Sequence, residues 1–285
     1  MVRTGGSLRG SLRVGGRELP WGVRTYVMGI VNVTPDSFSG DGVTDSLAAT
    51  QLAVAQHERG ADLLDVGGES TRPGHQPVEA AVEIARVVPV ISGLHARLSD
   101  AAISVDTYKP AVLRAAYEAG ARLVNCVWGA PEELLEAAAE LRVPIVAMHN
   151  QTGTSYDGPV MDCVLRYLES CAARAVAHGI SHEAIMLDPG IGFGKTADQN
   201  VAVLRELERL VALGFPTVLG TSRKSTLGKL TGREPADRVY ATVATTALAV
   251  KAGVDVVRVH DVAAARDAVA VADAVVRNWR PAGWT

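Results

Sequence analysis

The feature of this sequence that most limits its possible folds is an alternation, repeated eight times, of short apolar segments with longer segments of helical periodicity. The apolar segments predict strands at 27–33, 62–66, 102–106, 122–127, 143–148, 184–188, 216–221 and 254–259. The intervening segments predict helices at 45–59, 77–97, 109–119, 131–141, 160–178, 198–213, 235–252 and 262–277. Strands that alternate with helices pair in parallel through crossover connections. Over roughly 250 residues this pattern predicts an α/β fold, a single-domain (β/α)8 TIM barrel, with its working face at the carboxyl ends of the strands.

The predicted barrel occupies residues 27–280, and the residues before it predict a separate element. Residues 1–26 alternate polar and apolar side chains between Gly-rich breaks, which predicts a short hairpin-like extension or cap, with a partly disordered lead-in as the alternative. The alternative architecture, an open doubly wound sheet, usually carries a Gly-rich phosphate turn after its first strand. Here the first strand runs instead into NVTPDSF at 32–38, which favours the barrel.

A local repeat marks three of the turns from a helix into a strand. Gly60, Gly120 and Gly253 each suit a left-handed helix end, and a polar residue follows each of them five positions later. These polar residues stand at the exits of otherwise apolar strands: Asp65, Asn125 and Arg258. We expect Asn125 and Arg258 to be site residues and Asp65 to support a loop.

Charge and composition exclude several classes of function. The net charge is −3 and no basic stretch is long, so neither nucleic acid nor an anionic membrane is an expected partner. No segment approaches the roughly 18 apolar residues that span a bilayer. Three cysteines without a CxxC pair predict no disulfide framework or zinc site and indicate a cytoplasmic location.

The Gly-rich stretch DPGIGFGK at 188–195 invites comparison with a phosphate-binding P-loop. Pro189 stands where that pattern requires glycine, and GxGxxG spacing is missing as well. We expect instead that Asp188 accepts N–H bonds from the amino-pyrimidine edge of a flat ligand, beside a slim glycine loop. A carboxylate that caps a nearby helix remains the alternative.

Cations and hydroxyl groups follow the last two predicted strands. GTSRKS at 220–225 and RVHD at 258–261 make an anion site plausible, because loops after barrel strands 7 and 8 frequently hold phosphate. Asp106 ends the third strand and is either a catalytic group or the N-cap of the next helix. His149 is expected to pack or to hydrogen-bond rather than to bind a metal. Asn32 would suit Mg²⁺ that binds mostly through substrate phosphates.

Six motifs, each after a predicted strand, occur in order along the chain: NVTPDSF at 32–38, GGESTRPG at 67–74, SVDTYK at 104–109, DPGIGFGK at 188–195, GTSRKS at 220–225 and RVHDV at 258–262. Together they resemble the motifs of the dihydropteroate synthase family, over nearly the whole chain from Val27 to about Ala274. The resemblance implies a transferase of folate biosynthesis. It would condense 6-hydroxymethyl-7,8-dihydropterin pyrophosphate with 4-aminobenzoate, giving 7,8-dihydropteroate and pyrophosphate.

The resemblance also implies roles for individual residues. Arg258 would stack on the pterin ring and reach the pyrophosphate, and Asn32 would hold Mg²⁺. The pterin pocket would be lined by Asp106, Asn125, Asp188 and Lys224. The 4-aminobenzoate region would be formed by Thr71, Pro73, Phe193 and Ser225. Further anion contacts would come from Arg72 and His260, and the expected catalytic residues are Asp106, Lys224, Arg258 and His260. Loops 36–39 and 68–74 would close over the site.

A homodimer formed through the C-terminal helices and sensitivity to sulfonamides are further implications of the resemblance. One departure from the family pattern is Cys126, which follows Asn125 where the family usually has Asp. It keeps open the alternative of a catalytically silent pterin-binding relative. A folate-binding methyltransferase barrel is a second alternative, but it would need neither TRPG at 71–74 nor SRKS at 222–225.

Overall fold

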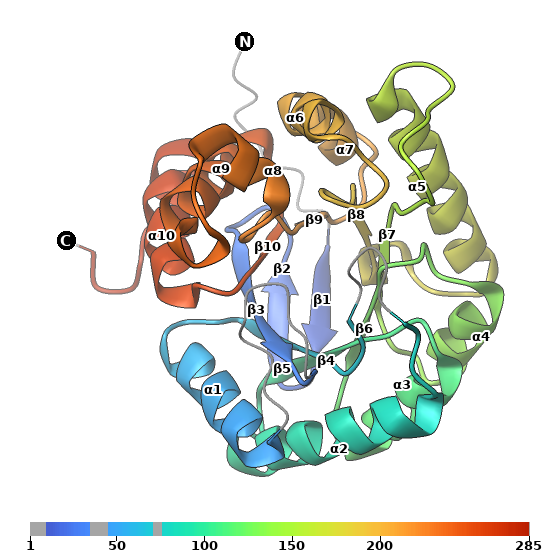
Figure 1. Cartoon of the computed structure of the whole chain (residues 1–285). Helices are drawn as coiled ribbons and strands as arrows, with labels where there is room; N and C mark the ends of the chain where they lie inside the picture. Colours follow the sequence, from blue (N-terminus) through green and yellow to red (C-terminus); the bar gives the residue numbers. More distant parts are fainter. Residues whose placement is uncertain (1–9, 35–44, 71–75, 285) are drawn as a thin grey trace.

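The computed structural model of the chain describes residues 10–34, 45–70 and 76–284. Parallel strands alternate with helices, as the sequence predicts (Figure 1). The strands of the main sheet are β3 (Tyr26–Asn32), β4 (Leu63–Gly67), β5 (Ala102–Asp106), β6 (Leu123–Cys126), β7 (Ile145–Met148), β8 (Ile185–Asp188), β9 (Val218–Leu219) and β10 (Val256–Val259). The helices are α1 (Ser46–Glu58), α2 (Ala80–Arg97), α3 (Pro110–Ala119), α4 (Glu132–Glu140), α5 (Val160–Ala177), α6 (Ala197–Arg205), α7 (Leu207–Val211), α8 (Ser225–Thr231), α9 (Val239–Ala252) and α10 (Val262–Val276), with short 3₁₀ helices η1 (His182–Ala184) and η2 (Pro235–Asp237).

The sheet curls into a nearly closed barrel. Its strand order is β8-β7-β6-β5-β4-β3-β10-β9, so the last strand of the chain pairs with the first barrel strand. At the remaining seam, Leu187 forms a parallel bridge with Thr217, and its N–H donates to the carbonyl of Pro216 at 2.9 Å. The helices surround this ring of strands (Figure 1). The predicted (β/α)8 barrel is therefore confirmed.

Alternation along each strand separates an inward from an outward face. One buried cluster inside the barrel contains a residue from each barrel strand: Met28, Leu63, Ala102, Leu123, Val146, Met186, Val218 and Val256. Their neighbours in sequence, such as Leu64 and Val124, belong to the larger core between strands and helices. A residue that follows one of these inward residues by two or four positions in the same strand therefore also faces inward, and it lies closer to the carboxyl end of the strand. Asp65, Asp106, Asn125, Asp188 and Arg258 all occupy such positions.

A β-hairpin closes the other end of the barrel. Strands β1 (Ser11–Val14) and β2 (Arg17–Pro20) pair antiparallel, which confirms the predicted hairpin-like extension. Their buried side chains and Trp21 join the cluster inside the barrel, and the indole Nε1 of Trp21 donates to the carbonyl of Glu183 at 3.1 Å. Figure 1 shows the hairpin across the ring of strands. It covers the face opposite to the predicted site.

The helices differ from the prediction in three places. The first turn of the helix predicted at 235–252 is a separate 3₁₀ helix, η2, and α9 begins only at Val239. The helix predicted at 198–213 is two helices, α6 and α7, that meet at Glu206. Helix α8 lies in a stretch that the sequence had indicated only as a loop, because seven residues with an internal glycine are too few to display apolar periodicity. Within the described ranges, no helix has the length and apolar character required to cross a membrane.

Candidate functional site

Arg258 is the centre of an ion-pair network at the carboxyl ends of the strands. Its Nε donates to Oδ2 of Asp65 at 2.7 Å, and its Nη2 donates to Oδ2 of Asp106 at 2.9 Å. Nδ2 of Asn125 donates to the same Asp65 oxygen at 2.9 Å. Strands β4, β5, β6 and β10 thus bring one polar side chain each to a single network. Asp65, expected to support a loop, instead lies fully buried inside the barrel and fixes the Arg258 guanidinium.

Asp106 is held in this network and caps no helix, since Lys109 occupies the N-cap of α3. Burial raises the pKa of Asp106 to about 7, and the neighbouring carboxylates of Asp65 and Glu83 add to the rise while Arg258 opposes it. A side chain whose pKa lies near neutrality beside a fixed guanidinium is typical of a functional site.

Asp188 binds the loop that follows β8. Its Oδ1 accepts the N–H of Gly190 at 2.7 Å, so the carboxylate caps a loop and not a helix. Burial raises the pKa of Asp188 to about 6, against the effect of the Gly190 hydrogen bond and of Lys224. Gly190 has a φ of +68°, and a Cβ there would lie 1.9 Å from the carbonyl oxygen of His149, so the loop requires glycine at this position.

Lys195 stabilises the same loop after β8 through hydrogen bonds to its backbone. Its Nζ donates to the carbonyls of Gly190 at 3.0 Å and Phe193 at 3.1 Å, and it contacts Nδ1 of His149 at 2.8 Å. Burial and the Lys195 charge lower the pKa of His149 to about 3, so the imidazole is neutral and accepts at Nδ1. Burial lowers the pKa of Lys195 to about 7. His149 is thus the packing and hydrogen-bonding residue that the sequence indicated.

Lys224 and Phe193 meet at the mouth of the barrel. The Lys224 Nζ lies 4.0 Å from the centre of the Phe193 ring, a cation–π contact. Burial lowers the pKa of Lys224 to about 8, and Arg258 adds to this while Asp188 and Asp106 oppose it. Asn200, which the sequence analysis overlooked, joins the two loops, because its Oδ1 accepts the N–H of Gly192 at 2.8 Å and its Nδ2 donates to Thr226 at 3.0 Å.

The loops after β9 and β10 are tied to each other. Both the backbone N–H and Nδ1 of His260 contact Oγ of Ser222, at 3.1 and 2.9 Å. Arg223 pairs with Asp261 through two bonds, Nε to Oδ2 at 3.1 Å and Nη2 to Oδ1 at 2.8 Å. These contacts join the loop that carries Lys224 to the end of the strand that carries Arg258 and His260, and the anion site expected there stays a prediction.

A second buried ion-pair group lies beneath the loop after β4. Nζ of Lys109 pairs with Glu69 and donates to Oε2 of Glu83 at 2.6 Å, and the Tyr108 hydroxyl donates to Glu69 at 3.2 Å. These contacts fix the start of the loop. Its continuation, with Thr71, Arg72 and Pro73, lies outside the described residues, as does the loop at 36–39.

Asn32 ends β3 next to the central network. Gly67 lies opposite it on β4, and a Cβ there would be 3.9 Å from Oδ1 of Asn32 and equally far from Oδ2 of Asp106. An amide oxygen and a carboxylate oxygen thus lie beside the bare backbone of Gly67, and such oxygen ligands fit a hard cation that keeps waters and substrate phosphates as its other ligands. The part of the chain that the structure describes holds no group of three or more His, Cys, Asp or Glu side chains arranged for a metal.

Two further positions bear on the predicted site. Ser225 is the exposed first residue of α8, next in sequence to the half-buried Lys224. Cys126 belongs to the core between strands and helices, and burial raises the pKa of its thiol to about 12, so it is a neutral packing residue. Position 126 faces away from the barrel interior, so its side chain takes no part in the central network.

Comparison with known proteins identifies the relatives of this chain. A family model described as pterin binding enzyme matches residues 28–260. A dihydropteroate synthase of Clostridium beijerinckii is 43% identical over 271 residues, which are 94% of this chain and 100% of the relative. The dihydropteroate synthase of Bacillus subtilis is 45% identical over 242 residues, 84% of each chain.

Solved structures agree with the sequence relatives. A dihydropteroate synthase from Xanthomonas albilineans with 4-aminobenzoic acid superimposes with a TM-score of 0.86 at 45% identity, covering 93% of this chain and 97% of that one. A dihydropteroate synthase from Yersinia pestis in complex with a sulfonamide drug gives a TM-score of 0.89 at 39% identity, covering 94% and 100%.

Proposed function

The chain belongs to the pterin-binding enzyme family, as a dihydropteroate synthase, and we propose how its own residues perform the condensation of that enzyme. The substrates are 6-hydroxymethyl-7,8-dihydropterin pyrophosphate and 4-aminobenzoate. The bond from the pterin methylene to the pyrophosphate oxygen breaks, and a bond from that methylene to the amine nitrogen forms. Pyrophosphate leaves with the bonding electrons, and the amine loses one proton.

The observation that carries this proposal is the Arg258 network. A guanidinium held by two carboxylates has a fixed plane, which prepares it to stack on a flat ring and to contact the leaving pyrophosphate. Asp188, Asn125 and Lys224 then bind the polar edge of the pterin, because a buried carboxylate is a strong acceptor for paired N–H groups. The pKa of Asp188, near 6, leaves it largely ionised at neutral pH.

Asp106 acts on the charge that develops. As the carbon–oxygen bond breaks, positive charge appears on the pterin methylene and ring, and ionised Asp106 stabilises it while Arg258, His260 and Lys224 neutralise the leaving group. Charges that are already oriented before the reaction commonly supply the largest catalytic contribution. No nucleophilic serine or cysteine is needed, which agrees with a thiol at position 126 that is buried in the core.

Two further assignments complete the proposed site. Mg²⁺, bound through Asn32, would supply neutralisation of the pyrophosphate charge. The 4-aminobenzoate region would include Phe193 and Ser225 together with Thr71 and Pro73, with Arg72 as a further anion contact. Phe193 lies beneath the Lys224 ammonium, which supports a position where an aromatic acid could bind.

The decisive experiment measures pyrophosphate release with both substrates and Mg²⁺. We expect release that requires both substrates, falls at least about 100-fold in Asp106→Asn and is unchanged in Asp198→Asn, a matched substitution of an exposed aspartate in α6. A sulfonamide should compete with 4-aminobenzoate. Tight binding of the pterin substrate without any release would instead identify a catalytically silent relative.

A homodimer is also proposed. Neighbouring helices α9 and α10 present large apolar side chains to solvent, with Tyr240 84% exposed, Leu248 59%, Val271 68% and Val275 80%. Val271 and Val275 are four residues apart and Tyr240 and Leu248 eight, about one and two helical turns, which places each pair on one face of its helix. An apolar surface of this kind is typical of a protein interface. The three cysteines are free thiols, which supports the cytoplasm as the location.

A further inference from the structure

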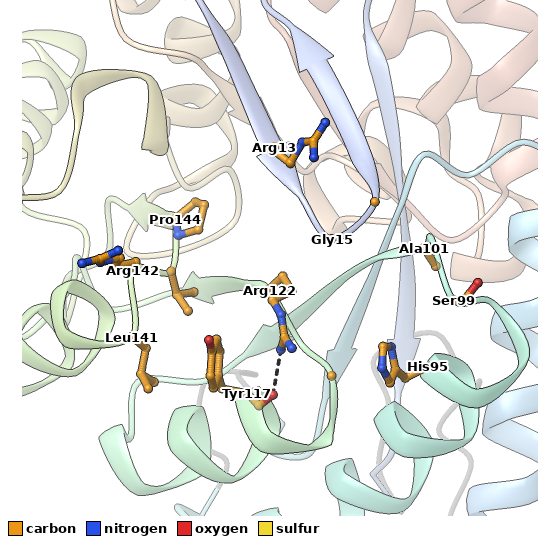
Figure 2. Close-up of a pocket in the computed structure, with 13 residues that line it drawn as sticks. Arg13, Gly15, His95, Ser99, Ala101, Tyr117, Arg122, Leu141, Arg142 and Pro144 are labelled. Atoms are coloured by element: carbon orange, nitrogen blue, oxygen red, sulfur yellow. Dashed lines mark hydrogen bonds between the residues drawn. The ribbon is translucent and has the colours of Figure 1, made fainter.

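A cavity of about 460 Å³ lies at the face of the barrel opposite to the proposed active site. It is formed by the turn of the β1–β2 hairpin and by the loops that enter β5, β6 and β7 (Figure 2). This volume is in the range of small-molecule sites. None of the catalytic or substrate-binding residues proposed above lines it.

The lining is strongly cationic. Arg13, Arg122 and Arg142 carry the positive charge, and none of the thirteen lining residues is an aspartate or glutamate. This contrasts with the net charge of −3 for the chain as a whole. The carboxylate of Glu18 lies opposite Arg13 in the hairpin, but it accepts the hydroxyl of Ser11 at 2.8 Å and does not line the cavity. A concave surface with one sign of charge attracts ions of the other sign.

Arg122 is held in position by its surroundings. Its Nη1 donates to the carbonyls of Tyr117 at 2.8 Å and Ala121 at 2.7 Å, and its guanidinium lies 4.4 Å from the centre of the Tyr117 ring. Figure 2 shows it in the middle of the lining residues, with Arg13 and Arg142 on different sides of it. Both of these side-chain hydrogen bonds use Nη1, so within the described part of the chain Nη2 and Nε can still donate to a ligand.

Arg142 occupies a backbone conformation that normally selects glycine. Its φ is +54°, at the end of α4 where the chain turns into β7. Glycines with positive φ stand at five other turns from a helix into a strand: Gly60, Gly120, Gly179, Gly214 and Gly253. An arginine in this position is strained, and such strain is typical of residues that are kept for function. Unlike a glycine, Arg142 also provides a charged side chain, which is exposed and lines the cavity.

We propose that this cavity binds a small polyanion, a molecule with two or more phosphate groups, between Arg122, Arg142 and Arg13. Guanidinium groups bind phosphate oxygens through paired N–H bonds, and three of them around one cavity favour several phosphates over one. The ligand would stabilise the folded chain, because a molecule that binds only the folded state raises its apparent stability.

The test uses inorganic triphosphate as the probe. Calorimetry measures its binding to the protein, and thermal unfolding measures the increase in Tm that it produces. Because triphosphate could also enter the active site, the intact protein is compared with two variants, Arg258→Ala and the double variant Arg122→Met with Arg142→Gly. We expect binding to persist in the first and to weaken at least about tenfold in the second. Retention in the double variant with loss in Arg258→Ala would overturn the proposal, as would the absence of any binding at low ionic strength.

The single variant Arg142→Gly distinguishes a role of Arg142 in binding the polyanion from a role in stabilising the fold. Arg142→Gly relieves the positive φ, so its Tm without ligand should rise by about 2 °C or more, while the increase in Tm produced by triphosphate should shrink. An equal response to triphosphate in Arg142→Gly and in the intact protein would contradict a role for Arg142. Pyrophosphate release should stay unchanged in Arg142→Gly, which keeps this test independent of the proposed catalytic function.

Discussion

At the scale of single residues, the raised pKa of Asp106 makes catalysis depend on pH. The proposed role requires the ionised carboxylate, and burial places its pKa at about 7 in the free protein. We therefore expect kcat/KM to rise with pH through about 7, since this ratio reports the ionisation of the free enzyme. Pyrophosphate release measured between pH 5 and 9 checks this. A ratio that is constant through this interval would contradict it.

The same pKa has a consequence for stability with the opposite direction. An unfolded aspartate loses its proton near pH 3.9, whereas folded Asp106 keeps it until about pH 7. Between these values the folded state binds more protons, so this side chain lowers the free energy of unfolding as the pH rises. Urea unfolding at several pH values should show that the free energy of unfolding declines less with rising pH in Asp106→Asn than in the intact protein. Identical pH profiles for the variant and the intact protein would exclude this contribution.

Lys195 supports the site without belonging to the proposed substrate contacts. Replacing it with methionine removes three contacts that hold the loop carrying Phe193, so the KM for 4-aminobenzoate should rise more than kcat falls. Lys229→Met changes an exposed lysine of α8 and should alter neither constant. Steady-state kinetics of both variants test this, and equal kinetics would show that the loop keeps its position without Lys195.

The sequence predicted the positions of the site residues better than their contacts. Their places at strand exits follow from local patterns, and the structure brings Asp106, Asn125 and Arg258 into one network. The role of Asp65 as the fixed partner of Arg258 could not be predicted, because it depends on two strands that are far apart in the sequence. Asn200 was missed for the same reason, although an asparagine inside a helix is a signal that can be recognised.

At the scale of elements, the hairpin contributes a large part of the barrel's internal packing. Trp21 is fully buried and meets Tyr26 edge to face, with ring centres 5.8 Å apart. We expect Trp21→Ala to lower the free energy of unfolding by about 3–5 kcal/mol, whereas Trp284→Ala, at a residue 67% exposed, should change it by less than about 0.5 kcal/mol. Chemical denaturation measures both, and equal losses would show that the hairpin is not part of the folded core.

The elements also show where prediction from sequence reaches its limit. All eight barrel strands were found, because apolar β-branched segments between helices form a strong signal. Helix α8 and the break between α6 and α7 were not, since short helices owe their stability to tertiary contacts such as the bond from Asn200 to Thr226.

At the scale of the whole molecule, the apolar face of α9 and α10 determines the expected assembly. Leu248→Glu would place a charge in the proposed interface and should convert a dimer into a monomer in analytical ultracentrifugation. Glu136→Lys, at an exposed position of α4 on the other side of the barrel (Figure 1), is the control and should leave the dimer intact. A monomer in the intact protein at micromolar concentration would contradict the proposal.

The pairing of β10 with β3 determines when this protein can finish folding. During synthesis β3 emerges before the seven other barrel strands, and one of its edges stays unpaired until β10, which follows all of them, has emerged. Until then the barrel is incomplete, so the apolar side chains of the hairpin cannot be fully buried. An unpaired strand edge is also exposed to other nascent chains. The barrel therefore closes only after β10 has left the ribosome, and a chaperone that shields the edge of β3 until then should increase the yield of native protein.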